Sequence, residues 1–339
     1  MRKAAATCVA LITSVAVLLL LNLLPAASGG ADVYRWQDDR GVWHFSDRPT
    51  ADASGQRIVD PPLLPIESSD PDGGGAGGLF WRIVKAGTRP SYLLGTLHVA
   101  DPRVTRLRPA VEAAFERADT FAMEAVLDGN ALMTLGSAML LPEAQDLESL
   151  VGSRLFARAV EALTEYGLSE AVIRRFKPWA VMALLGSPKP SGGPILDMAL
   201  YQRALARGIE VQGLESVQEQ VAVFEALSLK DQRALLSLTI EHLETLPSLF
   251  EQLIEAYATD DLSAIAAFAR TYQDRADLAA FNRFMFQLND ERNQRMAQRL
   301  EPILKEGNVF VAVGALHLAG PRGVIQLLRN RGYGVEPVP

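Results

Sequence analysis

Residues 308–317 read NVFVAVGALH, and this stretch determines most of what the sequence predicts about the fold. The unbroken apolar run 309–313, within the predicted strand 308–313, is typical of a strand buried on both faces of a sheet. Gly314 follows the run directly, and His317 stands three residues after that glycine. The stretch therefore predicts a buried strand that ends in a sharp turn and presents a histidine at the edge of the sheet.

The same arrangement occurs a second time, in residues 92–98, which read YLLGTLH. Gly95 stands near the end of this predicted strand, and His98 follows three residues later. The chain has only four histidines, so two Gly-x-x-His motifs, each at a strand end, are not expected by chance. Ligands of open α/β sheets bind outside the carboxyl ends of the strands. We therefore expect His98 and His317 to face a crevice at such an edge.

The other predicted elements extend this pattern into an α/β fold. Strands and helices alternate along much of the chain, which favours a central, mainly parallel or mixed sheet with many flanking helices. The predicted strands are 80–85, 92–97, 120–126, 210–214, 308–313 and 333–335. The predicted helices are 107–118, a long region 147–185, 195–207, most of 231–304, and 321–331.

Residues 1–31 have the composition of a secretory signal peptide: a basic start, an apolar run and a small-residue end. The apolar run is slightly short for a bilayer span, which favours cleavage over an uncleaved anchor. Residues 32–49 predict a small β-hairpin module, 50–78 a flexible linker rich in proline and glycine, and 79–339 the main domain. We therefore expect a periplasmic or secreted protein.

Composition excludes several kinds of function. The formal charge of −7 argues against a nucleic-acid partner and against attraction to an anionic membrane beyond the leader. The one cysteine, Cys8, lies inside the predicted leader, which excludes disulfides and thiolate metal sites from the mature chain. Any metal site would therefore have nitrogen and oxygen ligands only.

Two acidic residues also stand at predicted strand ends. Glu124 lies in the strand 120–126, and Glu215 follows the strand 210–214. Two histidines and a glutamate with an open position suit a catalytic divalent metal. Glu215 equally fits a partner arginine or a helix N-terminus. Arg292 lies in a charged helical run, whose default interpretation is a solvated face, and His242 is predicted on the surface of a helix.

Taken together, the motifs resemble those of the TraB/GumN family, to which the Tiki-type proteases are related. Residues 92–98 resemble the first motif of the family, 121–124 its acidic strand, and 313–320 its closing motif. Further matching segments follow the family's order: 176–179, 196–197, 213–215, Arg292 with Asn293, Gly323, and Gly332 with Tyr333. Separately, residues 34–49 resemble a small N-terminal module of unestablished function that is common in exported bacterial proteins.

The resemblance implies, for the Tiki branch, metal-dependent peptide hydrolysis. Carried over to this chain, it implies a site of His98, His317 and Glu124, with Glu124 as ligand or general base. It implies that Arg292 stabilises an oxyanion or orients a carboxylate. The sequence thus predicts an exported hydrolase of peptides, or of another small substrate, that uses manganese or cobalt, with zinc also compatible.

Two other functions fit the same residues. The first is a non-enzymatic periplasmic protein that binds a ligand or assists polysaccharide assembly. The second is a haem or cofactor binder with histidine as axial ligand, which no other feature of the chain supports.

Overall fold

The computed structural model describes residues 34–37, 43–46, 56–57, 77–189, 192–270 and 283–339. The chain divides into two compact units, one of residues 25–71 and one of residues 1–24 with 72–339. The predicted leader lies outside the described residues, as does most of the predicted linker. Within the described part of the chain, no helix is long and apolar enough to cross a membrane.

The smaller unit contains three short strands. They are β1 (Tyr34–Gln37), β2 (Trp43–Ser46) and β3 (Gln56–Arg57), and β1 pairs antiparallel with both of the others. Strands β1 and β2 lie within residues 32–49, for which the sequence predicts the hairpin module. The residues that would join them, 38–42, lie outside the described ones, so the hairpin module stays a prediction.

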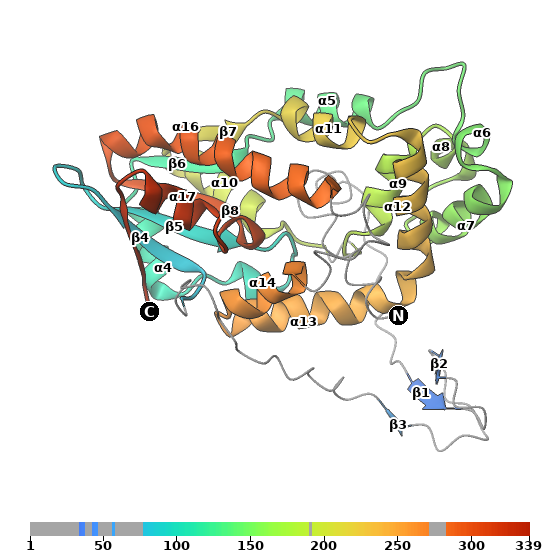
Figure 1. The fold of residues 1–339 in the computed structure, drawn as a ribbon, viewed down its shortest axis with the longest axis horizontal. Coiled ribbons are helices and arrows are strands. Elements are labelled where there is room, and N and C mark those ends of the chain that lie inside the picture. Colours follow the sequence, from blue (N-terminus) through green and yellow to red (C-terminus); the bar gives the residue numbers. More distant parts are fainter. Residues whose placement is uncertain (1–33, 38–42, 47–55, 58–76, 190–191, 271–282) are drawn as a thin grey trace. The chain divides into compact units, whose positions relative to one another are not determined.

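The larger unit is built on a mixed six-stranded sheet in the order β7-β6-β8-β5-β4-β9 (Figure 1). The four strands β7, β6, β8 and β5 run parallel, and β4 and β9 complete one side in antiparallel pairing. The strands are β4 (Phe80–Val84), β5 (Ser91–Thr96), β6 (Thr120–Ala125), β7 (Glu210–Glu215), β8 (Val309–Gly314) and β9 (Gly334–Pro337). This architecture confirms the predicted α/β fold.

Strand β8 lies near the middle of the sheet, and all six of its residues are buried. Val311 and Val313 pack into one hydrophobic cluster, whereas Phe310 and Ala312 pack into another. Helices contribute residues to both clusters, which explains why the strand is apolar at every position rather than at alternate ones. Those helices include α16 (Arg292–Glu306) and α17 (Val324–Asn330) in the first cluster, and α4 (Pro109–Glu116) and α10 (Leu196–Arg207) in the second.

A separate helical core surrounds α9 (Pro178–Leu185), whose eight residues are all buried. A helix that is apolar all round must be enclosed by others. Here the rings of Trp179 and Phe224 stack with centroids 5.1 Å apart. Helices that pack around it are α5 (Gly129–Ala138), α6 (Leu147–Val151), α7 (Ser153–Thr164), α8 (Glu170–Ile173), α11 (Val217–Glu225) and α12 (Leu229–Glu241).

Four separate helices occupy the long helical region that the sequence predicts over 147–185. Gly152 separates α6 from α7 at a φ of +87°, and Gly167 follows α7 at a φ of +76°. Both values lie in the left-handed region, which a continuous right-handed helix cannot contain. Pro178 then begins α9 at the position where its missing N–H costs least.

The remaining helical elements are α3 (Pro102–Thr105), α13 (Leu246–Ala258), α14 (Leu262–Arg270) and the short helices η1 (Leu243–Thr245), η3 (Phe286–Glu291) and η4 (Ala315–His317). Together with α12 and α16, several of these occupy the predicted helical region 231–304, of which 271–282 lie outside the described residues.

Gly95 allows the first Gly-x-x-His segment to pack closely against the second. A Cβ atom there would lie 2.7 Å from Leu318 Cδ1 and 3.1 Å from the Cα of Ala315. We expect Gly95→Ala to destabilise the fold by about 1–3 kcal/mol, because the backbone of Ala315 must shift. Gly136 in α5 is the control, since its Cβ would meet nothing within 4 Å. Urea unfolding should show Gly136→Ala neutral or stabilising; equal stability of both variants would contradict this packing.

Candidate active site

The carboxyl ends of four neighbouring parallel strands carry the candidate residues. In the register of the sheet, Thr96 of β5 pairs with Gly314 of β8, and Met123 of β6 pairs with Ala312 of β8. Because β8 lies between β5 and β6, the segments that carry His98, His317 and Glu124 reach the same edge. Glu215 ends β7, which is the next strand along.

Glu124 is buried, with 6% of its surface exposed, and both carboxylate oxygens accept hydrogen bonds. Oε1 accepts from the backbone N–H of Gly314 at 2.7 Å, and Oε2 accepts from Nη2 of Arg292 at 2.7 Å. Burial by itself raises the pKa of Glu124, but the charge that His317 carries in its protonated form, the charges of Arg292 and His98, and the Gly314 N–H outweigh it and hold it at about 2. The carboxylate is therefore ionised at neutral pH.

Arg292 is 1% exposed, so its interpretation as part of a solvated face is wrong. Its Nε donates to Glu215 Oε2 at 2.7 Å, which places the guanidinium between Glu124 and Glu215. Nη1 donates to the carbonyl of Leu288 at 3.2 Å. Two carboxylates and a carbonyl offset the cost of burying the arginine charge. The arginine belongs to α16, which continues directly from the π-helix η3, so one helical segment supplies both the guanidinium and its carbonyl partner.

His98 is held by one of its two ring nitrogens. Nδ1 lies 2.7 Å from Oδ2 of Asp197, which is itself buried. An ionised carboxylate only accepts hydrogen bonds, so the proton of this pair sits on Nδ1. Burial by itself lowers the pKa of His98, but the charge and hydrogen bond of Asp197 and the charge of Glu124 raise it above its ordinary value. Nε2 of His98 is buried and has no hydrogen-bond partner.

His317 is held in the same manner by a neutral side chain. Its Nδ1 lies 2.6 Å from Oδ1 of Asn293, and the amide nitrogen of Asn293 donates to the carbonyl of Arg322 at 3.0 Å. That second bond fixes the orientation of the amide, so Nδ1 of His317 carries the proton. Nε2 lies 3.6 Å from Glu124 Oε1. Burial, assisted by the charge of Arg292, outweighs Glu124 and lowers the pKa of His317 to about 3, so the ring is neutral.

The position that a Cβ atom of Gly314 would occupy, here called the hollow, lies among these groups. A Cβ atom on this glycine would lie 3.1 Å from Glu124 Oε1, 3.5 Å from His317 Cδ2 and 3.8 Å from His98 Nε2. The φ of Gly314 is −53°, which any residue adopts. The position therefore requires glycine because a larger side chain would crowd these three groups, and not because its backbone conformation is unusual.

The chemistry of these residues fits a divalent metal ion. The Nδ1 bonds of both histidines leave the two Nε2 atoms as candidate ligands. The Nε2 atom of His98 has no hydrogen-bond partner, whereas Nε2 of His317 lies 3.4 Å from Nη1 of Arg292. Glu124 adds an anionic oxygen. In the described part of the chain, however, no group of three or more His, Cys, Asp or Glu side chains is already arranged as a metal site. Arg292 takes the second oxygen of Glu124 through Nη2.

Sequence reasoning placed His98, His317, Glu124 and Arg292, and the structure brings all four together. It missed that Asp197 and Asn293 contact the histidines. Only the order of motifs pointed to these two residues, because neither stands at a strand end. The prediction of a surface position for His242 is wrong: it is 8% exposed, at the end of α12.

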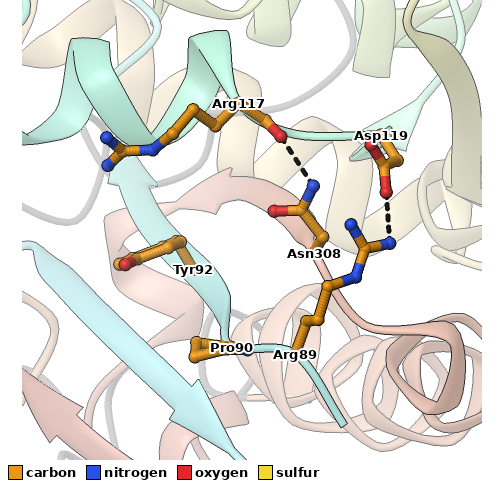
Figure 2. A pocket seen from close by; sticks show the side chains of 6 residues that line it. All are labelled: Arg89, Pro90, Tyr92, Arg117, Asp119 and Asn308. Carbon is orange, nitrogen blue, oxygen red and sulfur yellow. Dashed lines mark hydrogen bonds and ion pairs between the residues drawn. The ribbon is translucent and has the colours of Figure 1, made fainter.

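A pocket of about 460 Å³ lies at the opposite edge of the sheet (Figure 2). Its lining residues include Pro90, Asp119 and Asn308, which precede β5, β6 and β8. The amide of Asn308 donates to the carbonyl of Arg117 at 2.6 Å, and Arg89 pairs with Asp119 (Figure 2). The pocket thus lies at the amino ends of the strands, away from the histidines.

The sequence model of the TraB/PrgY/gumN family matches residues 79–337, and a domain of unknown function, DUF4124, matches residues 20–72. No solved structure matches the chain.

Three similar proteins illustrate the range of relatives. Metalloprotease TIKI1 of Danio rerio is 28% identical over 308 residues, which cover 74% of this chain and 61% of that protein. Metalloprotease TIKI1 of Homo sapiens is 26% identical, covering 74% of this chain and 60% of the relative. An uncharacterized protein of Treponema pallidum (strain Nichols) is 25% identical, and the match covers 75% of this chain and 80% of that protein. The chain thus spans about three fifths of the TIKI relatives.

Proposed function

Since the chain belongs to the TraB/PrgY/gumN family, we propose that it is an exported metal-dependent hydrolase of peptides, with its site at the carboxyl edge of β5, β8 and β6. One observation carries the proposal. Two buried histidines, each with its Nδ1 bonded to an oxygen, and one ionised glutamate lie around the hollow at Gly314. The names of the TIKI relatives, which describe metalloproteases, support the same reaction class.

His98, His317 and Glu124 would hold the ion, through Nε2 of each ring and Oε1 of the carboxylate. Manganese, cobalt and zinc all accept such a nitrogen and oxygen set. When bound, the ion would supply Lewis-acid polarisation of a carbonyl and a lowered pKa for a bound water.

The contacts of the protein's own side chains indicate which role each of them would have in the proposed site. Arg292 and the Gly314 N–H hold Glu124 in its ionised form, so it suits the role of an anionic ligand better than that of a general base. Arg292 donates to Glu124 and Glu215, which favours the second of its two predicted roles, that of orienting a carboxylate. Burial of both histidines excludes bulk water, so charges in the site interact more strongly than at the surface.

The proposal predicts that the purified protein binds a divalent ion and cleaves peptides. His98→Ala and His317→Ala should each lose the ion and lower cleavage at least 100-fold, because a three-ligand site does not retain a catalytic metal on two ligands. The measurements are metal content after manganese loading and turnover of a peptide library. His44→Ala is the control, since His44 lies outside the residues that match the family.

Two outcomes would contradict the proposal. One is a wild-type protein that binds no metal and cleaves nothing across the library. The other is full activity in a histidine variant that remains folded by circular dichroism. Metal binding without any cleavage would favour a non-enzymatic binding protein instead.

A further inference from the structure

A buried carboxylate stands behind His98, on the side away from the hollow at Gly314. Asp197 is 6% exposed, and both of its oxygens are used. Oδ2 lies 2.7 Å from Nδ1 of His98, and Oδ1 accepts from Thr96 Oγ1 at 2.7 Å. Thr96 and His98 flank Leu97, so one carboxylate bonds two side chains of the segment that leaves β5.

The local structure explains why a carboxylate is stable there. Asp197 lies in the first turn of α10, where the free N–H groups and the helix dipole favour negative charge. Its two hydrogen bonds replace water at both oxygens. A charge held in this way makes a stronger hydrogen bond to an imidazole N–H than a neutral acceptor does.

We infer that Asp197 is a positioning residue for the proposed site: it holds the proton of His98 on Nδ1 and, through Thr96, fixes the turn that aims Nε2 at the hollow. The inference rests on the proposed function only for the effect of Asp197 on metal binding, since Nε2 of His98 is the atom that would bind the ion. The hydrogen bonds themselves do not depend on it.

His317 provides the comparison within the same site. Its Nδ1 is bonded by Asn293, a neutral amide that is fixed by the carbonyl of Arg322. The two histidines therefore share one geometry but differ in the charge of the supporting group. Loss of such supporting partners typically lowers metal affinity about 10–100-fold.

The first test is a calorimetric titration of the metal-free protein with manganese chloride, which measures the affinity for the ion. We expect Asp197→Ala to weaken binding about 10–100-fold, and Asp197→Asn to weaken it less because an amide oxygen still accepts a hydrogen bond. Thr96→Val should have a smaller effect of the same kind. Thr239→Val is the matched control: Thr239 is fully buried, and its hydroxyl donates to the carbonyl of Leu235 within α12.

The second test does not require metal. With ¹⁵N-labelled histidine the chain gives four imidazoles, and a buried, hydrogen-bonded Nδ1 proton exchanges slowly enough to be observed. We expect such a proton on His98 in the wild type and in Asp197→Asn, and its loss in Asp197→Ala, while the His317 signal remains.

The two tests separate the inference from the proposed function. If the wild type binds no manganese but Asp197→Ala loses the Nδ1 signal, the proposed function fails and the role of Asp197 in holding His98 stands. If Asp197→Ala keeps the Nδ1 signal of His98 and wild-type manganese affinity, the inference is overturned. Should Asp197→Ala not fold, Asp197→Asn and Thr96→Val take its place, and wild-type manganese affinity in both of them would overturn the inference.

Discussion

Replacing Arg292 by methionine is expected to destabilise the protein by about 3–5 kcal/mol, because removal of one partner leaves buried charges uncompensated. The guanidinium contacts both Glu124 and Glu215, and the side chains of all three are nearly inaccessible to water. Methionine fills similar space but donates no hydrogen bond. Urea unfolding of wild type and variant measures the difference.

Arg299 is the matched control for this substitution. It lies in the same helix, α16, and forms two hydrogen bonds with Glu219, but 43% of its side chain is exposed. Water screens such a pair, so Arg299→Met should cost about 1 kcal/mol or less. If both variants lost the same free energy of unfolding, the buried ion pairs of Arg292 would not contribute more to stability than the exposed pair of Arg299.

Gly314→Ala is expected to abolish metal binding and to lower peptide cleavage at least about 100-fold, while leaving the fold intact. The new methyl group would occupy the hollow, 3.1 Å from the Oε1 atom of Glu124. A displacement of catalytic groups by as little as about 1 Å can cost 100-fold in rate. The backbone conformation suits alanine, so thermal unfolding should change little.

The contrast with Gly95→Ala makes this prediction specific. At Gly95 the added carbon meets Leu318 and the backbone of Ala315, which are packing groups, so stability should fall. At Gly314 it meets the side chains of the proposed site, so function should fall. Wild-type cleavage by a folded Gly314→Ala variant would show that the hollow is not used.

The sequence predicts the parts of this site that depend on local pattern. A strand that is apolar at every position must be buried on both faces, and a glycine after it marks the strand end, so His98 and His317 could be placed at a sheet edge. The strand order could not be predicted in this way. That β8 lies between β5 and β6, and so joins both histidines to Glu124, depends on packing across the whole sheet.

Arg292 shows the opposite case, in which local pattern misleads. A helix rich in arginine and glutamate is normally solvated, and only tertiary contact with Glu124 and Glu215 makes burial of this one arginine favourable. Asp197 is similar: an acidic residue in the first turn of a helix is ordinary, and its bond to His98 joins segments 99 residues apart. Partners at such separations leave no mark on the neighbouring sequence.

The central claim is that His98, Glu124 and His317 share one divalent ion, and a crystal structure of the manganese-loaded protein tests it most directly. Anomalous scattering locates manganese independently of any assumption about its ligands. The account predicts a peak at the hollow beside Gly314, bounded by Nε2 of each histidine and Oε1 of the glutamate. A peak held by other residues, or none at this hollow under saturating manganese, would contradict it.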